Sequence, residues 1–83
     1  MNQALLEDES IYQTADLSLA TTLSLFFPIE NLDRDNPRKT SFIFKRSQKL
    51  DALIANYWKG RITVEPQTYF NQLRVIKSRL YGE

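Results

Sequence analysis

The sequence predicts a small α+β domain, in which an antiparallel sheet of two or three strands packs against about three helices in the order βαββαα. Three observations predict this class: alternating apolar residues over 40–46, an amphipathic helix pattern directly after them, and a second such pattern that begins at Pro66. The 83 residues are enough for one such domain. We expect residues 1–10 to form a flexible acidic tail and residues 11–83 to form a single α+β domain.

Residues 40–58 hold the clearest local signals. Phe42 and Phe44 should face the core and Ile43 the other face of a strand, because successive side chains point to opposite sides. Ser47 fits the N-cap of the following helix, and Gly60 suits the left-handed position after its end. The apolar stripe of that helix, which we expect to face the core, is Leu50, Leu53, Ile54, Tyr57 and Trp58.

Before this segment the pattern is less regular. Ile11–Gln13 could form a short strand, and Thr14 is a suitable N-cap for a helix over about 15–26 that Pro28 would end. That helix is apolar on nearly every side, which is typical of a buried helix or of one that meets a second molecule. Two alternatives follow: the helix belongs to the core alone, or it also forms a homodimer or partner interface. The interface candidates are Leu17, Leu19 and Leu25.

The remaining elements follow from short patterns. Residues 29–32 read as a strand, and the turn-rich loop 33–39 predicts a hairpin with the strand 40–46. Pro66 fits the first position of a final helix. Its core stripe is expected to be Tyr69, Leu73, Ile76 and Leu80, and a second line beside it holds Phe70, Arg74, Lys77 and Tyr81.

The residue types that are missing limit the chemistry. There is no cysteine and no histidine, so the commonest nucleophile–base pairs and transition-metal ligands are absent. The only glycines are Gly60 and Gly82, which excludes a glycine-rich phosphate loop. We therefore expect no catalytic residues, no metal site and no cofactor, and we expect the protein not to be an enzyme. The lack of cysteine and of long apolar runs fits a cytoplasmic protein with no membrane partner.

The net charge of +1 conceals an uneven distribution. Residues 1–35 carry a net charge of −6, and residues 36–83 carry +7. One interpretation is that the two halves neutralise each other within the fold. The other is that a basic side of the molecule binds an anionic partner.

Three segments together resemble a known family. They are YQTADLSLATTL, SFIFKRSQKLDALIANYW and VEPQTYFNQLRVIKSRLY, and the resemblance covers about residues 11–81. They are similar to a family of small bacterial and phage-associated domains catalogued as domain of unknown function 5659. This resemblance implies a compact α+β unit that serves as an accessory protein of a phage or mobile element, and it supplies no activity.

Two functions remain open from the sequence. Basic residues interleaved with aromatic ones are typical of nucleic-acid binding. The candidate binding residues are Arg38, Lys39, Lys45, Arg46, Lys49, Arg74 and Lys77. The simpler interpretation of these residues is that Phe70 and Tyr81 complete the core and the cations form a solvated face. The alternative function is a protein–protein interaction module, such as an adaptor, inhibitor or complex subunit, that uses the apolar first helix or an edge of the sheet. In both cases we expect a small non-enzymatic binding module.

Overall fold

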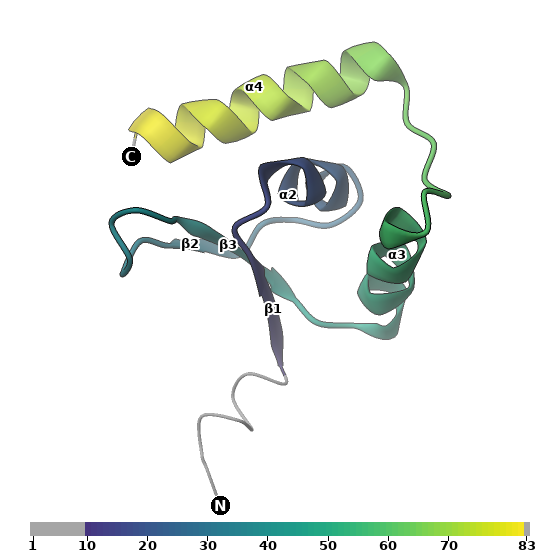
Figure 1. Ribbon diagram of the computed structural model, residues 1–83, viewed down its shortest axis with the longest axis horizontal. Coiled ribbons are helices and arrows are strands. Elements are labelled where there is room, and N and C mark those ends of the chain that lie inside the picture. The colour runs from purple at the N-terminus through teal and green to yellow at the C-terminus, as the bar shows by residue number, and fades with distance from the viewer. Residues whose placement is uncertain (1–9, 83) are drawn as a thin grey trace, which may run out of the picture.

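The computed structural model describes residues 10–82, so the expected tail over residues 1–10 lies outside the described residues except for Ser10. The elements are β1 (Ile11–Thr14), α2 (Leu17–Ser24), β2 (Asn31–Asp33), β3 (Ser41–Lys45), α3 (Gln48–Trp58) and α4 (Pro66–Gly82). This confirms the predicted α+β class and the order βαββαα (Figure 1). Within residues 10–82, no helix combines the length and the apolar character needed to cross a membrane.

The sheet has the strand order β1-β3-β2, and both pairings are antiparallel. Tyr12 lies opposite Phe44, and Leu32 lies opposite Phe42. Directly opposed residues point to the same face, so these four side chains share one face of the sheet. Phe42 and Phe44 are fully buried there, as the alternating pattern predicts.

The helix α2 is the centre of the molecule. It lies between the sheet and α4, with α3 packed at its side (Figure 1). Five consecutive residues of α2 are therefore buried: Leu19, Ala20, Thr21, Thr22 and Leu23. The two threonine hydroxyls are satisfied within the helix, because Thr21 donates to the Leu17 carbonyl at 2.8 Å and Thr22 to the Ser18 carbonyl at 3.0 Å.

This burial corrects one expectation about the interface. Leu19 is only 1% exposed, so its side chain belongs to the core and cannot contact a second molecule in the folded protein. Leu17 and Leu25 are half-buried, and Leu17 also packs against the core. The all-round apolar pattern of α2 thus arises because neighbouring elements cover it on several sides.

The cap of α2 is also different from the prediction. Thr14 ends β1, and its hydroxyl accepts a hydrogen bond from the Asp16 N–H at 3.1 Å. Asp16 is the N-cap, since its carboxylate accepts from the Leu19 N–H at 3.0 Å. The helix ends at Ser24 rather than near residue 26, and β2 begins at Asn31 rather than at residue 29.

The helix α3 has the predicted ends. The Ser47 hydroxyl accepts from the Leu50 N–H at 3.0 Å, and Gly60 has a φ of +71°. Leu50 is fully buried, while Trp58 is 63% exposed, so the prediction that Trp58 faces the core is wrong. Eight helical residues turn Trp58 by about 80° from Leu50, to the margin of the apolar face. Its ring packs edge-on against Tyr57, with 5.0 Å between the ring centroids.

The helix α4 begins at Pro66, as predicted. The Glu65 carboxylate accepts hydrogen bonds from the backbone N–H groups of Thr68 at 2.8 Å and Gln67 at 3.1 Å. These bonds favour the ionised carboxylate and lower the pKa of Glu65. The predicted core stripe is confirmed at Ile76, which is buried, and at Leu80, which packs against the core, while Tyr69 and Leu73 are half-buried.

Candidate nucleic-acid interface

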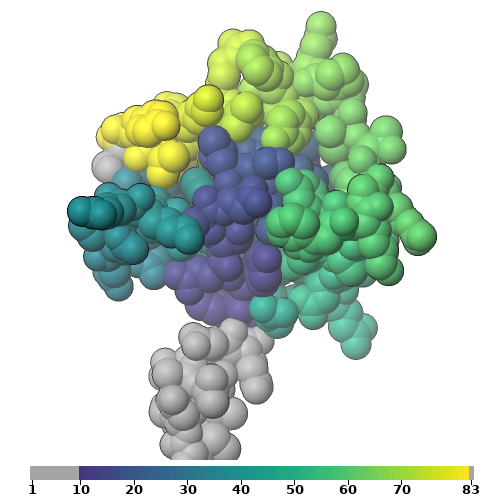
Figure 2. Space-filling model, in the orientation of Figure 1, coloured from purple at the N-terminus to yellow at the C-terminus, as the bar shows by residue number. Residues whose placement is uncertain are grey.

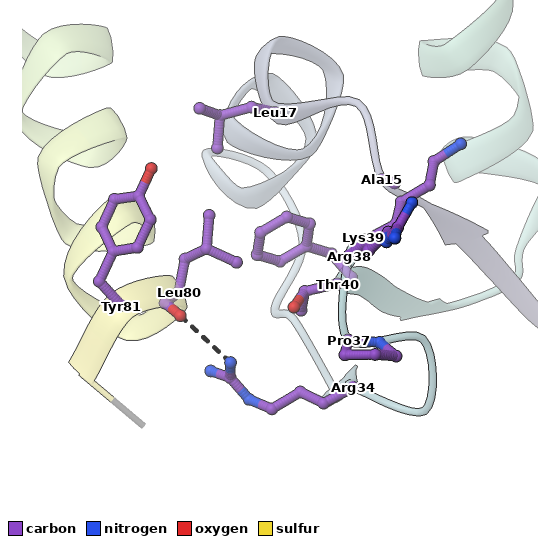
Figure 3. Close-up of a pocket in the computed structure, with 10 residues that line it drawn as sticks. Ala15, Leu17, Arg34, Pro37, Arg38, Lys39, Thr40, Leu80 and Tyr81 are labelled. Carbon is purple, nitrogen blue, oxygen red and sulfur yellow. Dashed lines mark hydrogen bonds between the residues drawn. The ribbon is translucent and has the colours of Figure 1, made fainter.

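A groove lies between the β2–β3 hairpin loop and the last turn of α4 (Figure 3). We call it the hairpin groove, and its volume is about 440 Å³. This volume lies within the range of about 300–1,000 Å³ that is usual for small-ligand sites. The residues that line it are Ala15, Leu17, Arg34, Pro37, Arg38, Lys39, Thr40, Phe42, Leu80 and Tyr81.

Apolar side chains from three separate elements line part of the hairpin groove. Leu17 begins α2, Phe42 lies in the central strand β3, and Leu80 lies near the end of α4. Phe42 is 1% exposed, and the two leucines are half-buried. This part of the groove is therefore continuous with the hydrophobic core, to which Phe42 belongs and against which both leucines pack.

Arg34 joins the hairpin loop to α4. Its guanidinium donates to the Arg79 carbonyl at 2.8 Å and to the Leu80 carbonyl at 3.1 Å (Figure 3). These carbonyls belong to the last turn of α4, where backbone acceptors lack helical partners and the helix dipole is negative. Arg34 thus has a structural role that sequence reasoning missed, since no local pattern connects residues more than 40 positions apart.

Arg38 and Lys39 are two of the predicted binding residues, and both line the hairpin groove. Their side chains are exposed and make no ion pair in the part of the chain that the structure describes. The loop that carries them is held by its own turn bonds, because the Asn36 side chain accepts from the Arg38 N–H at 3.0 Å. Tyr81 stands on the other side of the groove from these two cations (Figure 3).

A line of exposed residues continues from the groove along the outer face of α4. This α4 stripe consists of Phe70, Arg74, Lys77 and Tyr81. The Arg74 guanidinium lies over the Phe70 ring at 5.1 Å from its centroid. Phe70 is 55% exposed and Tyr81 is 79% exposed, so the alternative in which they complete the core is wrong.

The charge of α4 is of one sign. Between residues 66 and 82 the sequence has three basic residues and no acidic residue. Tyr81 belongs to both the α4 stripe and the hairpin groove, so the two surfaces are continuous. Together they carry four of the seven predicted binding residues: Arg38, Lys39, Arg74 and Lys77.

The other three predicted residues lie in the turn between β3 and α3. Lys45 and Lys49 are exposed there, but six residues of extended chain separate Lys39 from Lys45 by about 20 Å. Figure 2 shows the hairpin beneath the yellow end of α4 on one side of the molecule and the green α3 on the other. The structure therefore divides the predicted cations into two groups and does not bring them together.

Arg46 in this turn is held by its neighbours. It donates to Asp51 at 3.0 Å and to the Ile11 carbonyl at 3.3 Å, and it stacks over the Tyr12 ring at 5.3 Å. Burial raises the pKa of Tyr12, and the positive charge of Arg46 partly opposes that rise. Arg46 thus connects β1 to the start of α3, and its side chain has a structural role.

A family model described as "Domain of unknown function (DUF5659)" matches residues 9–82. The chain belongs to this family. The DUF5659 match covers every helix and strand described above, as well as both the hairpin groove and the α4 stripe. No curated protein and no solved structure matches the chain. DUF5659 membership therefore assigns no activity, and the function has to be argued from the side chains.

The described side chains offer charge neutralisation and ring stacking rather than metal ligation. Within residues 10–82, no three acidic, histidine or cysteine side chains gather where they could hold a metal ion. The groove instead combines guanidinium and ammonium groups with an exposed phenol ring and an apolar wall. Such a surface suits a ligand that carries both anionic groups and flat rings.

Proposed function

We propose that this protein is a non-enzymatic binding module that holds nucleic acid along the hairpin groove and the α4 stripe. The observation that carries the proposal is the continuity of these two surfaces at Tyr81. Cations and exposed aromatic rings are interspersed along them. A nucleic-acid strand carries phosphates that the cations can bind and bases on which the rings can stack.

Two acidic residues lie close to the groove along the chain. The hairpin carries Asp33 and Asp35, but neither lines the groove. The Asp33 carboxylate accepts hydrogen bonds from the Gln13 side chain at 2.7 Å and from the Asp35 N–H at 2.9 Å. These bonds hold the Asp33 carboxylate on the sheet and its own loop, although its charge remains. Residues 33–39 carry three basic and two acidic side chains, so the loop keeps a net charge of +1.

The test compares two double variants that lose the same charge. Arg38→Ala with Lys39→Ala removes cations from the groove, and Lys45→Ala with Lys49→Ala removes two from the β3–α3 turn. We expect binding of labelled DNA and RNA at low salt, measured by fluorescence anisotropy, to weaken far more in the first variant. Its plot of log affinity against log salt should also become shallower, by about 0.7–0.9 for each phosphate contact that is lost.

Two results would contradict the proposal. An absence of binding to any DNA or RNA at low salt would reject the nucleic-acid function. Equal weakening by both double variants would reject the placement on the groove. Circular dichroism of each variant shows whether the fold is retained, as expected for four exposed side chains.

A protein partner is the second candidate, and the end of α2 favours it. Leu25 is half-buried and the neighbouring Phe26 is 54% exposed, so apolar surface faces solvent there. Beside it lies a cavity of about 320 Å³ lined by Phe27, Pro28, Glu30, Lys45, Arg46 and Ser47. A homodimer or adaptor contact at this position would bury these apolar groups.

Sedimentation velocity tests the homodimer form of this alternative. A dimer that becomes monomeric in the Leu25→Glu variant, with unchanged circular dichroism, would support it. A wild-type protein that stays monomeric up to high concentration would count against it. Leu19→Glu is unsuitable for this purpose, because it places a charge in the core.

A further inference from the structure

The hairpin groove has a feature that neutralising phosphates does not require. The half-buried Leu17 and Leu80 provide an apolar wall beside the cations, with the buried Phe42 behind them. Exposed cations are sufficient to bind phosphates. A flat ring that packs against such a wall is stabilised in addition, because apolar surface is removed from contact with water. The groove is thus suited to a ligand that inserts a ring.

Tyr81 provides the face against which that ring can stack. It is 79% exposed and lies one residue before the end of α4, while its neighbour Leu80 is half-buried. Its ring stands across the groove from Arg38 and Lys39 (Figure 3). A base placed between them would have a stacking partner on one side and cations for its phosphate on the other.

The α4 stripe repeats this arrangement farther along the helix. Phe70 lies eleven residues before Tyr81, which is about 16 Å along α4. Its exposed ring also lines a hollow of about 500 Å³, together with Arg74 and three other residues of the first turns. The surface therefore presents two exposed rings with Arg74 and Lys77 between them.

A duplex would leave these rings without a role. Its bases are paired and stacked on one another, so a protein reaches only their edges, through hydrogen bonds and small apolar contacts. Exposed aromatic rings in a basic surface are instead used to stack on unpaired bases. The rings of the hairpin groove and the α4 stripe thus favour one class of nucleic acid.

We infer that the ligand is a single strand, and that one unpaired base occupies the hairpin groove, stacked on Tyr81 against the apolar wall. Arg38 and Lys39 contact the phosphates next to this base, and the strand continues along the α4 stripe toward Phe70. This inference rests on the proposed nucleic-acid function and adds the strand state and the position of a base.

The experiment uses three labelled oligonucleotides with equal numbers of phosphates in the bound strand: a single strand, the same strand in a duplex, and the same strand with abasic sites. DNA and RNA versions distinguish the two sugars. By fluorescence anisotropy at low salt, we expect the single strand to bind at least tenfold more tightly than the duplex. Tyr81→Ala should weaken its binding by about 5- to 150-fold, the effect of one lost stack, and Tyr81→Phe should not.

The abasic strand and a matched variant provide the controls. Tyr81→Ala should leave the weaker binding of the abasic strand unchanged, because no base remains to be stacked. Phe26→Ala removes another exposed ring, which is outside this surface, and should leave binding of all three ligands unchanged.

The outcomes separate the inference from the function on which it rests. If the duplex binds as tightly as the single strand, or if Tyr81→Ala weakens the intact and abasic strands equally, the stacking inference is overturned and the nucleic-acid function stands. If none of the oligonucleotides binds, both are overturned.

Discussion

Leu19→Ala tests whether α2 is the centre of the core. Leu19 is 1% exposed and packs in the cluster that includes Leu23, Phe44 and Ile76. The change deletes three buried carbon atoms, which removes about 2.4 kcal/mol of transfer free energy at about 0.8 kcal/mol per carbon. A cavity enclosed between the sheet and α4 adds to that loss, so we expect a total of about 3–5 kcal/mol. Domains of this size are stable by about 4–12 kcal/mol, and the variant should therefore be close to unfolding.

Urea unfolding followed by far-ultraviolet circular dichroism measures this loss. Fluorescence of Trp58 is a poorer signal, since that side chain is already 63% exposed in the folded protein. Leu25→Ala is the matched control: the same atoms are lost from a half-buried residue after the end of α2, and we expect about 1 kcal/mol or less. A loss below about 1 kcal/mol for Leu19→Ala, or equal losses for the two variants, would refute the central position of α2.

Three further predictions concern the ends of the helices. Asp16→Ala should lower the free energy of unfolding by about 1 kcal/mol, while Asp16→Ser, which keeps an acceptor for the Leu19 N–H, should change it little. Gly60→Ala should cost about 1–2 kcal/mol, because φ is +71° there and no steric contact within 4 Å adds to the backbone strain; Gly60→Asn should cost less. Because the pKa of Glu65 is lowered from its usual value of 4.5, the ionised carboxylate stabilises α4 at pH values above 4.5. This stabilisation is lost as the pH falls through the folded-state pKa. Glu65→Gln should thus be less stable than wild type at neutral pH and equally stable in acid. Urea unfolding of both proteins across this pH range measures the difference in the free energy of unfolding, and a difference that persisted in acid would contradict the prediction.

The sequence predicts most accurately the elements whose signals are local. The strand β3 alternates within five residues, Ser47 and Gly60 mark the two ends of α3, and Pro66 marks the start of α4. Each of these signals acts on the backbone of its own segment, so no other part of the chain is needed to read it.

The features that the sequence did not predict depend on distant neighbours. The apolar pattern places Trp58 at the margin of the α3 stripe. Trp58 is exposed because the elements that pack on α3 do not extend far enough to cover it. The sequence leaves both a core and an interface role open for Leu19, and the packing of α4 beside α2 decides for the core. In the candidate site, Arg38 and Lys39 could be predicted as cations, whereas the apolar groove wall and the role of Arg34 exist only in the folded chain.

The strand order β1-β3-β2 also has a consequence for the order of folding. Asp33 and Ser41 are paired across a short hairpin, whereas Ile11 has to find Lys45 across 34 positions of chain. Closing the longer loop costs about 1.3 kcal/mol more in chain entropy, so β2 and β3 should pair first and β1 should join them later. In hydrogen-exchange measurements on the native protein, the backbone amides of β1 should then exchange faster than those of β3. The contacts of Arg46 with the Ile11 carbonyl and the Tyr12 ring stabilise the strand that joins last.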